Sequence, residues 1–152
     1  MGTEIERKYL VNGDEWRVAD SQFYCQGYLN RDANRTVRIR IAGNEAWLTV
    51  KSITTNMTRA EFEYSIPLAD AEQMLQLCEE PLIEKRRYVV DYEGMSWEVD
   101  EFLGENEGLV VAEIELESET QPFQTPPWIG EEVTDDPRYF NSRLSIAPYK
   151  SW

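Results

Sequence analysis

The sequence contains no histidine among its 152 residues. This absence removes the side chain that most often acts as a general base near neutral pH, and it removes most zinc sites. It also excludes any catalytic arrangement in which a histidine activates a serine or cysteine nucleophile. A metal ion bound by this chain must therefore be held mainly by oxygen atoms, as is typical of Mg²⁺ and Mn²⁺.

Cysteines and long apolar segments are also scarce. The two cysteines, Cys25 and Cys78, have no spacing that resembles a metal motif, and no apolar run approaches the length of a membrane span. The N-terminal residues do not resemble a signal peptide. We therefore expect a cytoplasmic protein with two reduced thiols that serve in packing.

Positive charge is limited: 15 Lys and Arg residues stand against 29 Asp and Glu residues, which gives a formal net charge of −14. Such an acidic surface argues against binding to nucleic acid or to an anionic membrane. If the ligand is an anion, the few basic side chains must be concentrated in a sheltered place. The hydrophobic content of 41% indicates a folded chain, and the length predicts a single domain over residues 1–152.

Short segments separated by turn residues dominate the chain, which is typical of a β-sandwich or a β-barrel. The predicted strands are 3–11, 22–30, 36–42, 45–51, 59–66, 82–92, 95–103 and 109–117. One short helix is expected over Glu15–Ala19, and a second helix, capped by Asp70, is expected to continue to Cys78. The tail after residue 117 is expected to be mostly irregular, with one short helix capped by Thr134.

Charged side chains alternate with apolar ones in nearly every predicted strand. In the strand 36–42 (TVRIRIA), Arg38 and Arg40 share one face, and in the last predicted strand Glu113 and Glu115 do the same. A half-exposed antiparallel sheet also alternates, but two like charges about 7 Å apart on one face are destabilising. We therefore predict that the ionic face lines a closed barrel. The apolar face would look outward, covered by helices, the C-terminal segment or a partner subunit.

The side chains predicted to face the interior carry both signs. The bases are Lys8, Arg38, Arg40, Lys51, Arg59, Lys85 and Arg87, and the acids are Glu4, Glu6, Glu61, Glu63, Glu98, Asp100, Glu113, Glu115 and Glu117. Acids that hold Mg²⁺ or Mn²⁺, beside Arg and Lys that bind phosphate oxygens, are typical of phosphoryl transfer. A metal-polarised water can attack the terminal phosphorus, so no side-chain nucleophile is required.

The N-terminal motif EIERK resembles the E-x-E-x-K signature of CYTH proteins, the triphosphate tunnel metalloenzymes. The resemblance continues in order through CQGYL, VRIR, LTVK, RAEFE, EKRRY, EVDEF, AEIELES and GEEVTDDPRYFNSRLS, and it is greatest to the short, single-domain bacterial members. It implies a mainly β (α+β) fold, namely a closed eight-stranded antiparallel β tunnel with a charged lumen and a few helices packed outside. Phe140 and Ser145 depart from the family's pattern in the tail.

The resemblance also implies roles for individual residues. Divalent metal would be bound by Glu4, Glu6, Glu113 and Glu115, with Glu61, Glu63 and Asp100 supporting or sharing that role. The triphosphate would be held by Lys8, Arg38, Arg40, Lys51, Lys85 and Arg87, with Arg59 either contacting it or pairing with an acid in the lumen. Tyr28 matches a tyrosine that, together with the motif lysine Lys8, helps to activate water, although a phenol of pKa about 10 needs a cationic neighbour to do so.

These features together predict metal-dependent hydrolysis of a triphosphate, with inorganic triphosphate as the preferred substrate and pyrophosphate and phosphate as products. Hydrolysis of nucleoside or thiamine triphosphate and adenylate cyclisation are alternatives on the same fold. A module that binds polyphosphate or nucleotide without turnover is a further alternative. The expected partner is a small anionic triphosphate, and exposed apolar strand faces would favour a homodimer.

Overall fold

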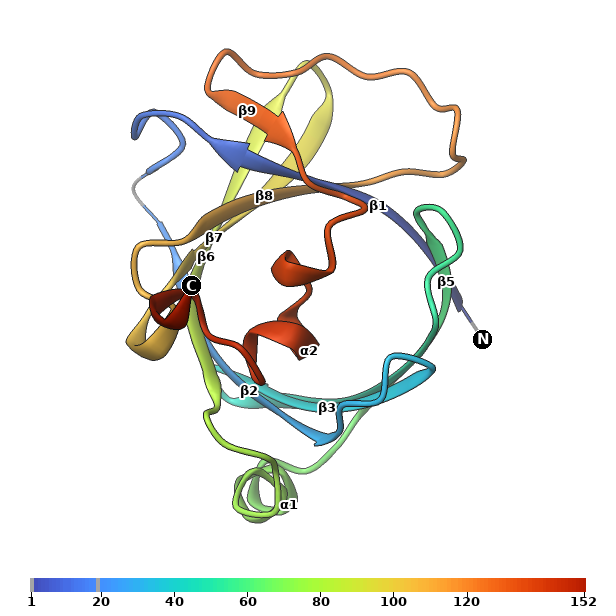
Figure 1. Cartoon of the computed structure of the whole chain (residues 1–152), viewed down its shortest axis with the longest axis vertical. Coiled ribbons are helices and arrows are strands. Elements are labelled where there is room, and N and C mark those ends of the chain that lie inside the picture. Colours follow the sequence, from blue (N-terminus) through green and yellow to red (C-terminus); the bar gives the residue numbers. More distant parts are fainter. Residues whose placement is uncertain (1, 19) are drawn as a thin grey trace.

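The computed structural model describes residues 2–18 and 20–152. Within these residues, nine strands form one antiparallel sheet in the order β5-β4-β3-β2-β6-β7-β8-β1-β9, and an additional pairing of β5 with β1 closes eight of them into a barrel (Figure 1). The strands are β1 (Gly2–Val11), β2 (Gln22–Asn30), β3 (Arg35–Ala42), β4 (Glu45–Ser52), β5 (Thr58–Ser65), β6 (Ile83–Tyr92), β7 (Met95–Phe102), β8 (Val110–Glu115) and β9 (Ile129–Glu132). The predicted closed antiparallel barrel is confirmed.

Two tight turns hold neighbouring strands in register. Gly43, between β3 and β4, has a φ of 61°, which a hairpin turn with glycine in its first position requires. Glu93 and Gly94, between β6 and β7, have φ values of 49° and 80°, as in a two-residue type I′ turn. In the β3–β4 and β6–β7 hairpins that these turns connect, every second side chain of a strand faces the same side of the barrel wall.

The inner face of the barrel changes character along its length. On β6, Lys85 and Arg87 face inward, and Ile83 lies on the same face because it precedes Lys85 by two residues. Ile83 belongs to an apolar cluster with Phe102 and Val111, which occupy the corresponding inner positions of β7 and β8. The interior is therefore ionic over most of its length but apolar at one end, whereas the sequence predicted an ionic face throughout.

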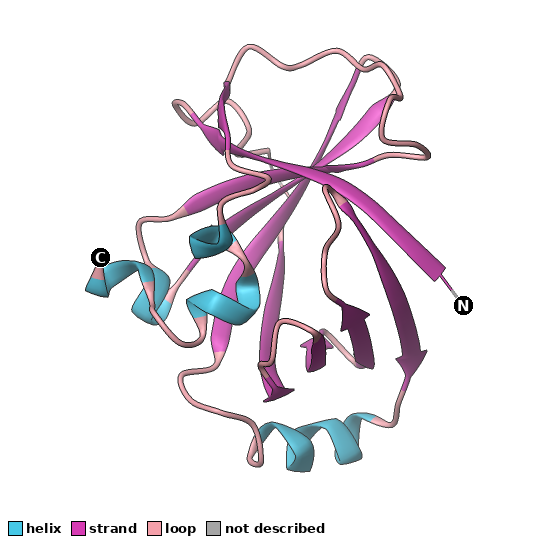
Figure 2. Ribbon diagram, turned by 45° about the vertical axis from the view of Figure 1, so that its right-hand side comes forward, coloured by secondary structure: helices cyan, strands magenta, loops and turns pink. Residues whose placement is uncertain are grey.

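The helix α1 (Leu68–Leu75) covers the outer face of β2, β3 and β4, with Ala71 in an apolar cluster that includes Ile39 (Figure 2). The predicted cap at Asp70 is wrong. The helix begins after Pro67, whose φ of −60° suits the entry to a helix, and Asp70 lies within the first turn.

The segment between β1 and β2 forms a turn where the sequence predicted a helix. No helix is formed over residues 15–18, and Ala19 lies outside the described residues. Trp16 is 2% exposed and packs edge-on against Tyr88 of β6, with ring centroids 5.2 Å apart. The burial of this large side chain on the outer face of β6 holds the segment in its turn and overrides a weak local helical preference.

The tail carries more structure than the sequence predicted. The short helical segments of the chain outside α1 are η1 (Gly104–Asn106), η2 (Pro137–Tyr139), α2 (Asn141–Leu144) and η3 (Tyr149–Ser151). The strand β9, which was not predicted, pairs with β1. Asp136 caps η2 by accepting a hydrogen bond from the backbone N–H of Arg138. The predicted cap Thr134 is wrong, because its hydroxyl accepts instead from the backbone N–H of Lys8 at 3.0 Å.

Two parts of the tail lie on opposite sides of the barrel wall. Phe123 and Trp128 cover the outer apolar face, where Trp97 of β7 is completely buried. The helix α2 lies inside the ring of strands (Figure 1), where Leu144 is completely buried in the apolar cluster of the interior. None of the helices in residues 2–18 and 20–152 has the length and apolar character needed to cross a membrane.

Candidate active site

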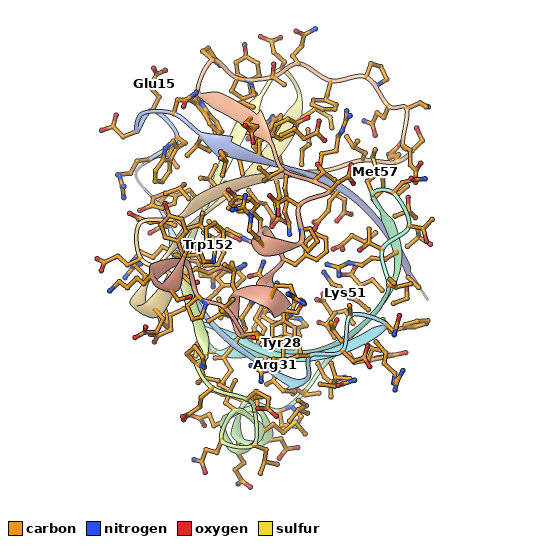
Figure 3. All side chains as sticks on the ribbon, viewed as in Figure 1. Glu15, Tyr28, Arg31, Lys51, Met57 and Trp152 are labelled. Carbon is orange, nitrogen blue, oxygen red and sulfur yellow. The ribbon has the colours of Figure 1, made fainter. Side chains whose placement is uncertain are left out.

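A cavity of about 210 Å³ lies inside the barrel, and all the predicted site residues except Asp100 line it. These residues are Glu4, Glu6 and Lys8 of β1, Tyr28 of β2, Arg38 and Arg40 of β3, Lys51 of β4, Arg59, Glu61 and Glu63 of β5, Lys85 and Arg87 of β6, and Glu113 and Glu115 of β8. Lys51 lies inside the ring of strands, whereas the exposed Glu15 points away from it (Figure 3). The period-two pattern therefore identified the charged side chains that line this cavity.

Asp100 is on the inner face of the barrel but does not line the cavity, and its carboxylate binds two of the lining bases. Its Oδ2 accepts a hydrogen bond from Lys85 Nζ at 2.7 Å, and Arg87 binds both carboxylate oxygens through Nε at 2.8 Å and Nη2 at 2.9 Å. Burial favours the neutral acid, but the charges of Arg87 and Lys85 outweigh burial and lower the pKa of Asp100 to about 2. Asp100 thus fixes the positions of Lys85 and Arg87.

The positive charge of Arg40 is not paired with an acidic side chain of the described residues. Arg40 makes no salt bridge within residues 2–18 and 20–152, and its Nε donates instead to Gln26 Oε1 at 2.9 Å. Burial and the nearby charges of Arg38 and Arg87 lower the pKa of Arg40 to about 9. A buried, incompletely balanced set of cations of this kind favours an anionic ligand.

Arg38 has hydrogen-bonding capacity that the folded chain leaves unused. Its side chain is 8% exposed, and its Nε is buried with no hydrogen-bond partner among the described residues. Its Nη2 donates to Thr49 Oγ1 at 3.3 Å and lies 3.7 Å from Glu63 Oε2. Because an unpartnered buried N–H of an arginine is costly, the free donor indicates a place for an acceptor such as a phosphate oxygen.

A second group of charged residues surrounds Glu4 on β1. Lys51 Nζ contacts both carboxylate oxygens of Glu4, at 2.9 and 3.1 Å, and Arg59 Nε donates to Oε1 at 3.0 Å. Burial alone would raise the pKa of Glu4, but Lys51 and Arg59 lower it to about 2. Glu4 is therefore ionised at neutral pH and balanced by two bases.

Carboxylates crowd together beside Glu4. Burial and the negative charges of Glu113 and Glu4 raise the pKa of Glu6 to about 8. Lys8 Nζ lies 3.7 Å from Glu6 Oε1 and 3.6 Å from Glu113 Oε1, and the register pairs Glu6 with Glu115 across the two strands. Crowded carboxylates are oxygen ligands whose mutual repulsion a divalent cation would relieve, so the donor set fits such an ion.

These acids do not form a ready-made metal cage. Within residues 2–18 and 20–152, no three acidic side chains are arranged so that together they could hold one ion. Glu4 is held by its bases, as described above, and the Glu63 side chain is 43% exposed. Metal binding therefore requires side-chain rotations that exchange some of the existing ion pairs.

Tyr28 lies beside Arg38 in the register of β2 and β3 and is 4% exposed. Its hydroxyl makes no hydrogen bond to another described residue. Burial and the charges of Glu4 and Glu6 have the largest effects on the pKa of Arg59, and Tyr28 makes a smaller contribution that raises it. Arg59 is therefore a cation within electrostatic range of the Tyr28 side chain.

One interior residue proposed from the sequence lies elsewhere, and several lining residues were missed. Glu117 is exposed and outside the cavity, because β8 ends at Glu115. The missed lining residues are Thr36, Thr49, Phe140, Asn141 and Ser142. The two threonines occupy the same strand faces as Arg38 and Lys51, so the alternation could have identified them. The three tail residues could not be found in this way, because nothing local indicates that α2 enters the barrel.

Comparisons with known proteins agree with this architecture. The family model described as "CYTH domain" matches residues 2–145. A protein of Acetivibrio thermocellus named inorganic triphosphatase is 52% identical over 154 aligned residues, which cover 100% of this chain and 99% of that protein. A protein of Nitrosomonas europaea with the same name is 36% identical and covers 95% and 98%. The crystal structure of the inorganic triphosphatase NE1496 has a TM-score of 0.67 at 36% identity, with 96% of each chain covered.

Proposed function

This chain belongs to the CYTH domain family, and from that premise we propose that it hydrolyses inorganic triphosphate to pyrophosphate and phosphate. Relatives that cover essentially the whole chain bear the name inorganic triphosphatase. The observation that carries the proposal is the unpaired positive charge of Arg40 in the cavity, beside the unused donor of Arg38. Arg40 has no acidic partner among the described residues, and Arg38 retains a free buried donor. A triphosphate would supply both the negative charge and the acceptors.

The composition of the cavity supports an inorganic substrate over a nucleotide. Its lining is almost entirely charged or hydroxylic, with Tyr28 and Phe140 as the aromatic members among the described residues. A volume of about 210 Å³ is below the usual range for pockets that hold drug-sized molecules. A nucleoside or thiamine group would need additional apolar contacts, which these residues do not provide.

We propose that Glu4, Glu6, Glu113 and Glu115 hold Mg²⁺ or Mn²⁺, with Glu61 and Glu63 in support. When bound, such an ion lowers the pKa of water and neutralises charge on phosphate oxygens. Asp100 supports the site indirectly, because both its carboxylate oxygens are engaged by Lys85 and Arg87.

The side chains of the chain itself bind and orient the substrate. Arg38, Arg40, Lys85 and Arg87 hold phosphate oxygens in the inner part of the cavity. Lys51 and Lys8, which pair with acids of the same cavity, also contact the substrate. The closed barrel wall limits the access of bulk water, which strengthens each charge interaction. We propose that Tyr28, whose phenol interacts with the charge of Arg59, accepts a proton from the attacking water when it is ionised to the phenolate.

Domain organisation, location, partners and oligomeric state belong to the same proposal. We treat residues 1–152 as a single domain that acts in the cytoplasm on a small anion, without nucleic-acid or membrane partners. Formation of a homodimer would bury exposed apolar groups such as Leu77, which is 76% exposed.

A substrate panel tests the proposed function. The purified chain is incubated with tripolyphosphate, ATP, thiamine triphosphate or pyrophosphate, with Mg²⁺ and with Mn²⁺ in separate reactions, and phosphate release is measured. Tripolyphosphate is expected to give the highest kcat/KM, and EDTA is expected to abolish turnover. A higher kcat/KM for ATP or thiamine triphosphate would replace the proposed substrate. Tight binding of tripolyphosphate without turnover with either metal would indicate a binding module.

A further inference from the structure

Asn141 stands at the inner end of the cavity, on a segment that enters the barrel from the tail. It is the first residue of α2 and lines the cavity, while Leu144 of the same helix packs in the apolar cluster with Ile83. The helix therefore presents one polar side chain to the cavity and one apolar side chain to the apolar cluster of the interior.

A chain of hydrogen bonds determines which way the Asn141 amide faces. Arg40 can only donate, and its Nε donates to Gln26 Oε1 at 2.9 Å. The Nε2 of Gln26 is thereby directed to Asn141 Oδ1, at 3.0 Å. Lys85 Nζ, which also donates to Asp100, contacts the same Oδ1 at 3.3 Å. Because both contacts to Oδ1 come from donors, the orientation of the amide follows from its partners.

The Nδ2 group of Asn141 is left with two N–H donors and no acceptor among the described residues. It belongs to a residue that lines a cavity rich in cations, and Gln26, which fixes its orientation, is completely buried. A donor with a fixed orientation, on a residue that lines a polar cavity, favours an anionic oxygen there.

We propose that Asn141 is a substrate-binding residue whose Nδ2 donates a hydrogen bond to an oxygen of the phosphoryl group at the inner end of the cavity. This inference rests on the proposed function and deepens it. Because α2 occupies the barrel beyond Asn141, the phosphoryl group that reaches it is terminal and carries no ester. A neutral amide adds a donor without further repulsion among Arg40, Lys85 and their neighbours.

The test separates binding of phosphate from attachment of α2. Asn141→Leu removes the amide at similar size and without a change of charge, whereas Gln26→Leu removes the link to α2 and keeps the amide. Steady-state kinetics with tripolyphosphate and Mg²⁺ give KM and kcat/KM, and titration calorimetry in EDTA gives the Kd of tripolyphosphate. Arg143→Gln, on an exposed position of the same helix, is the matched control and is expected to leave all values unchanged.

Asn141→Leu is expected to lower kcat/KM at least tenfold, mainly through KM. Gln26→Leu is expected to lower it by a smaller factor, because it keeps the Asn141 donor and loses only the contacts that orient Asn141 and Arg40. A value for Asn141→Leu within threefold of the wild type, or equal effects of the two substitutions, would overturn the proposal. If Asn141→Leu does not fold, Asn141→Asp replaces it, because the aspartate keeps both acceptor contacts of Oδ1. It must lower kcat/KM at least tenfold without lowering Tm, and unchanged kinetics would overturn the proposal.

The same measurements distinguish this inference from the proposed function. If the wild-type chain hydrolyses tripolyphosphate but is insensitive to Asn141→Leu, only the role of Asn141 is lost. If the wild-type chain hydrolyses no tripolyphosphate with either metal, the proposed function fails, and the role of Asn141 is overturned with it.

Discussion

Lys85 of β6 and Asp100 of β7 form a completely enclosed ion pair, with Nζ 2.7 Å from Oδ2 and each side chain 1% exposed. Arg87 occupies the remaining oxygen of Asp100. One acid thus supports two of the bases that face the cavity. The pair connects the stability of the barrel to the positive charge of its interior, since removal of the acid leaves cations without compensation.

Asp100→Asn is therefore expected to destabilise the fold by about 3 to 5 kcal/mol, because buried charges are left unpaired. Glu101→Gln is the matched control on the next residue of β7. Its partner Arg17 is 45% exposed, so the loss of that surface pair is expected to cost less than about 1 kcal/mol. Urea unfolding measures both values. Similar costs for the two substitutions would contradict the supporting role of Asp100.

Because Glu6 lies among other carboxylates, we expect its ionisation to lower the free energy of unfolding as the pH rises. In the folded chain the pKa of Glu6 is raised to about 8, above the ordinary glutamate value of 4.5. The folded state therefore binds this proton more tightly than the unfolded state. The resulting stabilisation is complete below pH 4.5, is lost progressively between pH 4.5 and about 8, and is absent at higher pH.

Glu6→Gln, which has no proton to lose, is expected to raise Tm in EDTA, with little gain near pH 4.5 and the largest gain near pH 8. We expect about 2 kcal/mol at most, since the Glu6 side chain is 16% exposed and its charge is partly screened. Calorimetry across this pH range provides the measurement. Glu72→Gln, on the exposed side of α1, controls for the loss of one negative charge. A gain that is constant with pH would argue against the crowding of Glu6.

Binding of a polyanion is expected to stabilise the barrel through Arg38. In EDTA, tripolyphosphate at one hundred times its Kd should add about 2.7 kcal/mol to the free energy of unfolding, which raises Tm by several degrees. Arg38→Gln should greatly reduce this rise. Arg35→Gln lies on the same strand, but its side chain is 71% exposed, so it should retain the full rise. Retention of the full rise in Arg38→Gln would exclude Arg38 from binding.

The thiol of Cys78 is expected to resist alkylation in the folded protein. Burial raises its pKa to about 11, so that the thiolate fraction at pH 8 is about one in a thousand. Iodoacetamide labelling followed by mass spectrometry compares the native chain with the chain unfolded in guanidinium. Native Cys78 should react at least tenfold more slowly, and equal rates in the two states would show that the site opens readily.

The sequence was sufficient to identify which side chains share a face, because alternation along a strand is a local property. Arg38 with Arg40, and Glu113 with Glu115, could be assigned to a common interior before any tertiary contact was known. Closure of the barrel also followed from the pattern, since so many like charges on one face are unfavourable on a simple surface. These inferences required no knowledge of strand order.

Only the tertiary structure determined how deeply each side chain is buried in the barrel and which other side chains it contacts. The pairing of β1 with β8 sets Lys8 opposite Glu113, and the lateral packing of β6 and β7 encloses Asp100 behind Lys85 and Arg87. Glu117 shares the alternation of Glu115 but lies outside the cavity, because the strand ends before it. Entry of Asn141 into the barrel depends on the fit of Leu144 against residues far away in sequence. Local periodicity specifies the direction of a side chain, whereas its environment depends on register, strand ends and packing between distant segments.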